Sequence, residues 1–243
     1  MTAGTLLGIG LGPGDPELLT VKAVRLIKSA PVIAHFAKAG RRGNARRTVD
    51  MWMPPACIEM PLHYPVTTEI AHETAEYNDR LAGFYDTAAQ SVATHLAAGR
   101  DVALLCEGDP LFYGSFMHLH VRLRTRFAVT IVPGVTGMSG CWTAAGAPIT
   151  WGDDVLTVLP GTLPLATLTA RLAQSDAAVV MKLGRNFAKV RDAIHAAGLT
   201  ERAIYVERGT LAEQIVTPLA DKHDDVAPYF SLVLVPGCGR RPQ

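Results

Sequence analysis

Two loops that contain Gly-Asp-Pro constrain the fold of this chain more than any other feature. The first loop reads GIGLGPGDP at residues 8–16, and the second loop reads CEGDPLFYGSF at residues 106–116. Each follows a short apolar run and precedes a helical pattern, so each should lie at the carboxyl edge of a parallel sheet. Because open α/β sheets bind their ligands at that edge, the two loops predict a binding site there.

The first loop does not match the glycine patterns of the common nucleotide-binding folds. A dinucleotide fingerprint needs glycines at its first, third and sixth positions. Counting from Gly8 puts Pro13 at the sixth position, and counting from Gly10 puts Asp15 there. The chain also has no Gly-x-x-x-x-Gly-Lys-Ser/Thr run. Asp15 and Asp109 would repel a phosphate, so the loops favour a ligand with cationic or hydroxyl groups, although Asp and Pro also form ordinary turns.

The bulk composition indicates an ordinary soluble globule. The 243 residues are 49% hydrophobic, enough for one large core or two smaller ones. A net charge of +1 gives no attraction toward nucleic acid or anionic membranes, and the apolar runs are too short to cross a bilayer. The first residues contain no basic region and no long apolar stretch, so we expect a cytoplasmic protein without nucleic-acid or membrane partners.

The cysteines and histidines are not spaced like metal ligands. The four cysteines are far apart and form no Cys-x-x-Cys pair, so we expect neither disulfides nor a structural zinc site. We therefore expect no protein-bound metal, and any metal should arrive within a substrate. The cysteines are Cys57, Cys106, Cys141 and Cys238.

Apolar runs and helical patterns alternate in the first half of the chain, which predicts a parallel α/β sheet. The runs of the second half are less regularly separated by helices, which favours a mixed sheet. We expect strands at 5–11, 32–36, 57–60, 101–107, 129–133, 155–159, 177–182, 203–206, 215–217 and 231–235. We expect helices at 18–30, 67–98, 115–123, 136–145, 163–174 and 186–197, and a disordered tail at 239–243.

The motifs resemble those of the tetrapyrrole methyltransferases, the S-adenosylmethionine-dependent superfamily of corrin, sirohaem and diphthamide biosynthesis. The first loop, followed by LLT at 18–20, is similar to the amino-terminal signature of that superfamily. The second loop, VPGVT at 132–136 and VLTVLPGT at 155–162 resemble the branch that methylates C20 of precorrin-2 in cobalamin biosynthesis. The resemblance runs from about Thr5 to Pro236, with the motifs in the expected order.

This resemblance implies a two-domain α/β fold whose active site lies in the cleft between the domains. We place the boundary near Val135. Residues 1–135 then form an N-terminal α/β domain that carries the tetrapyrrole trough and the donor loop. Residues 136–243 form a C-terminal α/β domain that completes the S-adenosylmethionine pocket. The resemblance also implies a homodimer.

The resemblance further implies a set of residues that bind the methyl donor. Gly108 would let backbone amides approach the ligand, and Asp109 would accept from an amine or a ribose hydroxyl. Phe112 and Met181 would sandwich the adenine between polarizable surfaces, and the alternative is that both are core residues. The full set is Pro13, Gly108, Asp109, Phe112, Thr136, Gly137, Met181 and Gly209.

One dense basic segment, RRGNARR at residues 41–47, is a candidate for binding the acceptor. Such runs are usually solvated loops. A tetrapyrrole, however, carries many acetate and propionate groups, and arginine forks bind carboxylates in a planar bidentate way. We predict that this segment is a loop beside the trough, where Arg41, Arg42 and Arg46 hold substrate carboxylates.

Methyl transfer from a sulfonium needs alignment more than a catalytic triad, and no triad is visible. Substitution at a ring carbon still requires the loss of a proton. Some relatives have an acidic residue just after the second strand, where this chain has Phe36 preceded by His35. His35, with an ordinary pKa of about 6.5, and Tyr113 are the candidates for the acceptor. Asp15 either accepts a hydrogen bond from a pyrrole nitrogen or caps the following helix.

The leading hypothesis is a methyltransferase that converts precorrin-2 to precorrin-3A with S-adenosyl-L-methionine as donor. The main alternative is the same methylation of cobalt-factor II, since nothing in the sequence tells whether the ring already contains cobalt. Methylation of another corrin carbon and a non-catalytic tetrapyrrole carrier are further alternatives. A nucleotide-binding oxidoreductase is disfavoured by the missing sixth glycine.

Overall fold

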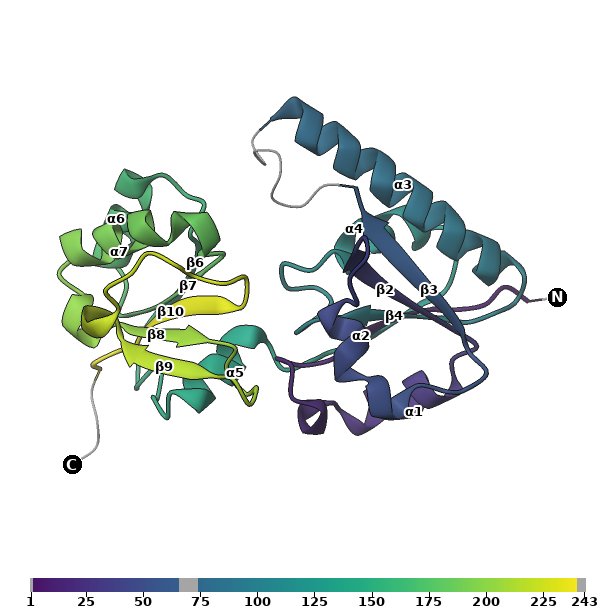
Figure 1. The fold of residues 1–243 in the computed structure, drawn as a ribbon, viewed down its shortest axis with the longest axis horizontal. Coiled ribbons are helices and arrows are strands. Elements are labelled where there is room, and N and C mark those ends of the chain that lie inside the picture. The colour runs from purple at the N-terminus through teal and green to yellow at the C-terminus, as the bar shows by residue number, and fades with distance from the viewer. Residues whose placement is uncertain (1, 66–73, 240–243) are drawn as a thin grey trace. The chain divides into compact units, whose positions relative to one another are not determined.

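The computed structural model describes residues 2–65 and 74–239. The chain forms two compact units, which Figure 1 shows. The chain divides into Met1–Thr136 and Gly137–Gln243. Two predictions fall partly outside the described residues: the first turns of the helix expected at 67–98, and the tail beyond residue 239.

The first unit contains the predicted parallel sheet. Its five strands lie in the order β3-β2-β4-β1-β5, and every neighbouring pair is parallel. β1 and β4 are buried along their whole length, as expected of central strands covered on both faces. The strands are β1 (Leu6–Gly10), β2 (Val32–Lys38), β3 (Ile58–Tyr64), β4 (Val102–Cys106) and β5 (Val129–Val132).

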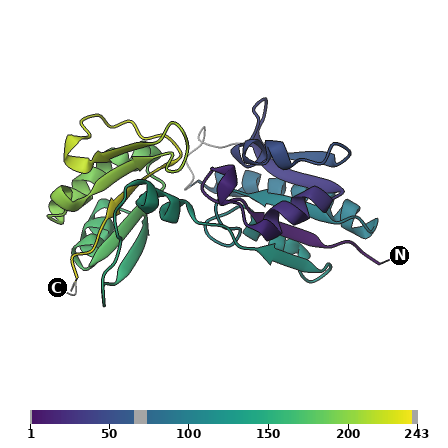
Figure 2. The same cartoon turned by 90° about the horizontal axis from the view of Figure 1, so that it is seen from below.

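Helices cover both faces of this sheet, and Figures 1 and 2 show them as separate layers. One core packs α3 (Ala75–Ala97) and α4 (Phe116–Leu123) against one face. The other core packs α1 (Val21–Ser29) and α2 (Asn44–Thr48) against the opposite face. Successive residues of each strand point alternately into the two cores. The sheet from which both Gly-Asp-Pro loops emerge is therefore packed on both faces.

The second unit contains the predicted mixed sheet, in the order β6-β7-β10-β8-β9. β6 and β7 are parallel, whereas β10 is antiparallel to both of its neighbours and β9 is antiparallel to β8. One core contains side chains of α6 and α7, and a smaller core contains Cys141 of α5. The elements are α5 (Gly137–Ala144), β6 (Leu156–Pro160), α6 (Leu165–Ala173), β7 (Ala177–Met181), α7 (Phe187–Ala196), β8 (Ile204–Glu207), β9 (Ile215–Pro218) and β10 (Ser231–Val235).

Two details of the first unit differ from the sequence expectations. The first helix begins at Val21 rather than at residue 18, because Thr20 accepts the Ala23 N–H at 3.1 Å and the separate 3-10 turn η1 (Pro16–Leu18) precedes it. The basic segment is not a loop throughout, because residues Asn44–Thr48 form α2. A second 3-10 turn, η2 (Asp50–Trp52), follows α2. Along 2–65 and 74–239, no helix is long and apolar enough to cross a membrane.

Candidate active site

Three chain segments meet at the carboxyl edge of the first sheet with their backbones in direct contact. A Cβ on Gly134, just after β5, would lie 2.1 Å from the Gly108 carbonyl oxygen and 2.9 Å from the Gly10 carbonyl carbon. A Cβ on Gly10 would in turn lie 2.5 Å from the Gly134 nitrogen. No side chain fits between these segments, so glycine is required where β1, β4 and β5 end.

The two Gly-Asp-Pro loops are also joined by hydrogen bonds. The Gly108 N–H donates to the Gly12 carbonyl at 2.8 Å, and the Gly12 N–H donates back to the Gly108 carbonyl at 3.3 Å. Gly108 has a φ of +66°, a left-handed conformation that glycine adopts without strain. The sequence predicts that both loops lie at this edge, and the structure places them side by side.

Asp109 links the second loop to the segment after β5. Its Oδ1 accepts the Leu111 N–H at 2.9 Å, and its Oδ2 accepts the Gly134 N–H at 3.1 Å. The carboxylate therefore orders the loop itself. Each carboxylate oxygen can accept more than one hydrogen bond, so the predicted contact with the methyl donor stays a prediction.

Asp15 performs the capping role that was one of its two alternatives. Its Oδ1 accepts the Glu17 N–H at 2.8 Å at the start of η1. The contact with a pyrrole nitrogen remains a prediction. Pro13 is half-buried in the same loop.

One residue of the aromatic pair in the second loop, Tyr113, has an unusual backbone conformation. Tyr113 has a φ of +53°, which a bulky residue rarely adopts and which costs on the order of 1–3 kcal/mol. Its side chain is exposed, and its ring lies edge-on to Phe112 with centroids 4.8 Å apart. Strain of this kind persists where the surroundings impose it, which is typical of ligand-binding loops.

The second unit shows the same kind of strain beside its predicted donor-binding residues. Met181 ends β7 half-buried, and the next residue, Lys182, has a φ of +57°. Arg208 and Thr210, with φ of +47° and +76°, flank Gly209. A Cβ on Gly209 would lie 2.8 Å from the Cys141 sulfur, so this loop packs closely on α5.

Thr136 and Gly137 lie on either side of the boundary between the two units. Thr136 is the last residue of the first compact unit, and Gly137 opens α5. A Cβ on Gly137 would have no atom within 4 Å, so its backbone is open to a ligand. The two sets of donor-binding residues remain predictions.

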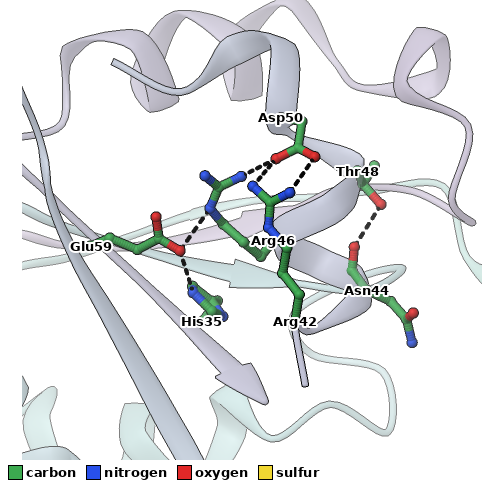
Figure 3. A network of polar contacts seen from close by, with 7 residues as sticks. All are labelled: His35, Arg42, Asn44, Arg46, Thr48, Asp50 and Glu59. Atoms are coloured by element: carbon green, nitrogen blue, oxygen red, sulfur yellow. Dashed lines mark hydrogen bonds and ion pairs between the residues drawn. The ribbon is translucent and has the colours of Figure 1, made fainter. Parts of the chain in front are cut away.

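Two of the three predicted substrate-binding arginines are engaged within the protein (Figure 3). Arg46 is 7% exposed, and its Nε donates to Glu59 at 2.8 Å while Nη1 pairs with Asp50. Arg42 forms a fork with Asp50 through bonds of 2.9 and 2.5 Å. We predicted from the sequence that Arg46 lies on a loop and holds a substrate carboxylate, but it lies in α2 and its guanidinium is paired with Glu59 and Asp50. Arg41 is exposed.

His35 is placed less favourably for proton transfer than the sequence suggests. It is 3% exposed in β2, and its Nε2 lies 3.1 Å from Glu59 Oε1. Burial lowers the pKa of His35, and the nearby Glu59 offsets this only in part. The imidazole is therefore neutral at pH 7 but enclosed, which disfavours direct contact with a substrate.

Glu107 also lies at this edge, within the second Gly-Asp-Pro loop. It follows β4 directly and is exposed. Its carboxyl group lies near Asn44 and Ala45 of α2. In the sequence, the signal for it is its position directly before Gly108 of the Gly-Asp-Pro motif. Among the described residues, no group of three or more His, Cys, Asp or Glu side chains is arranged to hold a metal ion.

Comparison with known proteins identifies the family. A family model described as Tetrapyrrole (Corrin/Porphyrin) Methylases matches residues 5–222. This chain belongs to that family. It is 59% identical to the precorrin-2 C(20)-methyltransferase of Sinorhizobium sp over 98% of each chain. It is 30% identical to the cobalt-precorrin-2 C(20)-methyltransferase of Salmonella typhimurium over 96% of each chain.

The solved structures agree on the fold. Uroporphyrin-III C-methyl transferase from Thermus thermophilus, complexed with S-adenyl homocysteine, covers 95% of this chain and 97% of its own with a TM-score of 0.66. At 23% identity this likeness shows the fold alone. The predicted parallel and mixed sheets of the family are thus confirmed by the strand order and by this neighbour.

Proposed function

We propose that this chain transfers a methyl group from S-adenosyl-L-methionine to C20 of precorrin-2, giving precorrin-3A and S-adenosylhomocysteine. The observation that carries the proposal is the 59% identity to a precorrin-2 C(20)-methyltransferase along nearly the whole of both chains. The match to the relative named for cobalt-precorrin-2 is only 30%, which favours the cobalt-free substrate.

The donor-binding part of the proposal is supported by the strained loops. Phe112 and Met181 expose enough polarizable surface to contact an adenine, since neither is fully buried. The residues proposed to bind the donor are Pro13, Gly108, Asp109, Phe112, Thr136, Gly137, Met181 and Gly209. That the sets in the two units hold one donor molecule is part of this proposal.

We propose that the basic segment at residues 41–47 binds the tetrapyrrole, with a different role for each of its three predicted arginines. Arg41 is exposed, so it is the best placed to meet a substrate carboxylate. Arg42 is half-exposed and would exchange Asp50 for such a carboxylate. Arg46 is buried against Glu59 and Asp50, so it would hold α2 in place rather than touch the substrate.

The reaction depends on the relative positions of the donor and the acceptor. The methyl carbon moves from the sulfonium sulfur to the ring carbon, the C–S electrons remain on sulfur, and the ring carbon then loses its hydrogen as a proton. Holding the sulfur, methyl and acceptor carbon in line contributes about 7–11 kcal/mol to the lowering of the barrier. The backbones at Gly10, Gly108 and Gly134 are packed directly against one another. They would therefore form a rigid base for such alignment.

The test is incubation with precorrin-2 or cobalt-factor II and donor labelled in its methyl group, followed by location of the label on the ring. Label at C20 of precorrin-2 is the expected result. Faster transfer to cobalt-factor II would assign the cobalt substrate instead, and label on another carbon would refute the assignment of position.

Calorimetry with S-adenosylhomocysteine separates an enzyme from a carrier. A methyltransferase should give a saturable heat of binding, whereas a non-catalytic tetrapyrrole carrier should give none. The same preparation, measured by light scattering, tests the proposed homodimer.

A further inference from the structure

We propose that Tyr64 and Tyr85 position the second Gly-Asp-Pro loop for the methyl donor by holding the Ser115 hydroxyl. Ser115 lies at the end of this loop, two residues after the strained Tyr113 and directly before α4. The inference rests on the proposed function, because the donor is the ligand that this loop is proposed to bind. The two tyrosines act through Ser115 and are therefore positioning residues.

Three hydroxyl groups from separate elements meet at Ser115. Its Oγ lies 2.5 Å from the Tyr64 hydroxyl and 3.1 Å from the Tyr85 hydroxyl. Tyr64 is the last residue of β3, and Tyr85 lies within α3. A serine hydroxyl has one proton and two acceptor lone pairs, so it can bond with both phenols at once. The two bonds tie the end of the loop to a strand and to a helix of the first unit.

Ser115 does not use its hydroxyl in the way that its position favours. It is the N-cap residue of α4, where a serine side chain commonly accepts a backbone N–H of the first helical turn. Here the side chain forms no capping bond, and the backbone of Ser115 is itself helical, with φ of −68° and ψ of −17°. A residue that gives up a local bond for bonds to distant side chains is typical of a functional site.

The rings that carry the two phenols are themselves held in place. The Tyr64 ring stacks on Phe36 of β2 with centroids 5.4 Å apart. The Tyr85 ring is 5% exposed and stacks on His118 of α4 at 4.1 Å. Burial raises the pKa of Tyr85, and the bond with Ser115 offsets the rise only in part, so the phenol keeps its proton at neutral pH. The packing of the rings thus fixes where the two hydroxyls lie.

These bonds explain how Tyr113 keeps its left-handed backbone. A bulky residue with φ of +53° relaxes unless its surroundings prevent this. Asp109 holds the first part of the loop by accepting the Leu111 N–H, and Ser115 holds the last part through the two tyrosines. With both parts held, the loop has its binding conformation before a ligand arrives, so less ordering is needed on binding.

The test measures the Kd of S-adenosylhomocysteine by calorimetry in Tyr64→Phe, Tyr85→Phe and Ser115→Ala. Each phenylalanine keeps the ring and removes one bond, so Kd should rise about fivefold, the usual effect of one hydrogen bond. Ser115→Ala removes both bonds and should raise Kd about 20-fold. Because Tyr64 acts through Ser115, adding Tyr64→Phe to Ser115→Ala should change Kd by less than about twofold. The control, Tyr77→Phe, removes a phenol oxygen of α3 that does not bond with Ser115, and it should bind like the parent.

Two further measurements separate positioning of the loop from a general loss of packing. The KM for the tetrapyrrole should change by less than about twofold in the three variants, because only the donor loop is loosened. Asparagine tolerates the left-handed conformation, so Tyr113→Asn should reduce the effect of Ser115→Ala on Kd by at least about threefold. An undiminished effect would refute the role of Ser115 in holding the backbone of Tyr113.

Parent affinity in either Tyr64→Phe or Tyr85→Phe would overturn the proposal, and these two variants decide it if Ser115→Ala does not fold. Additive losses in the double variant would also overturn it, because Tyr64 would then act independently of Ser115. A KM for the tetrapyrrole that rises as much as the Kd of S-adenosylhomocysteine would refute it too, since the phenols would then contact the macrocycle.

The two proposals fail in distinguishable ways. A parent protein that gives no saturable heat with S-adenosylhomocysteine refutes the proposed function. Hydrogen exchange without ligand tests the hold on the loop separately. The Leu111 and Phe112 amides, which bond to Asp109, should exchange at least about tenfold faster in Ser115→Ala. Unchanged exchange in a protein that binds S-adenosylhomocysteine refutes only the positioning role.

Discussion

Replacement of Gly134 by alanine tests whether the three backbones at the sheet edge are as tightly packed as the structure describes. The new Cβ would lie 2.1 Å from the Gly108 oxygen and within 3.0 Å of two Gly10 atoms, all of them backbone. Overpacking of this kind costs about 3 kcal/mol when no side chain can move aside. Loss of chain entropy in the unfolded state offsets about 0.5–1 kcal/mol, so we expect a net destabilisation of about 2 kcal/mol.

Urea unfolding measures this loss. With a slope of about 2 kcal/mol per molar, the midpoint of the first unit should fall by about 1 M. Hydrogen exchange of the β1 and β4 amides would assign the loss to this unit, since two units need not unfold together. The control is Gly83→Ala in α3, where a Cβ meets nothing within 4 Å and alanine favours the helix. If Gly134→Ala unfolds at the parent midpoint, the close approach of the loops is wrong.

Three further predictions follow from the site. Arg46→Ala should destabilise the protein by about 2 kcal/mol at pH 7, because both acidic partners are partly exposed and the full cost of a broken buried pair does not apply. Desolvation raises the pKa of Glu59, but the hydrogen bonds from Arg46 and from the neighbouring histidine outweigh it and lower the pKa overall. The stability from this pair is therefore present above the unfolded pKa of about 4.3 and is lost as the pH falls through the lower folded value, so urea titrations at pH 7 and pH 3 should show a smaller effect of Arg46→Ala at pH 3. Arg41→Ala should raise the KM for the tetrapyrrole about tenfold, with the Kd of S-adenosylhomocysteine unchanged and Arg47→Ala as the matched control; equal losses of both affinities would contradict it. Met181→Ala should weaken the binding of S-adenosylhomocysteine, measured by calorimetry, by about 1–2 kcal/mol without lowering the free energy of unfolding by more than about 2 kcal/mol, and unchanged affinity would place Met181 outside the donor site.

The parts of the fold that the sequence predicts are those set by local pattern. β1 and β4 are continuous apolar runs because both faces of a parallel sheet are covered, and Thr20 marks the helix start because its hydroxyl caps the first turn. The second loop is identified because glycine and proline fix its turn. These signals depend on residues within a few positions of one another.

The parts that the sequence could not predict depend on distant partners. α2 is a single helical turn among charged residues, and Arg46 is buried only because Glu59 and Asp50 lie beside it. The strained conformation of Lys182 carries no signature, since it is not a glycine, asparagine or aspartate.

The pair of hydrogen bonds between Gly12 and Gly108 has a consequence for how this sheet edge can vary among relatives. Because each Gly-Asp-Pro loop supplies the hydrogen-bond partner of the other, an inserted residue in either loop would break both bonds. Changes of length should therefore be found elsewhere, and natural variants should alter this edge by exchanging side chains such as Glu107 on a backbone of constant length.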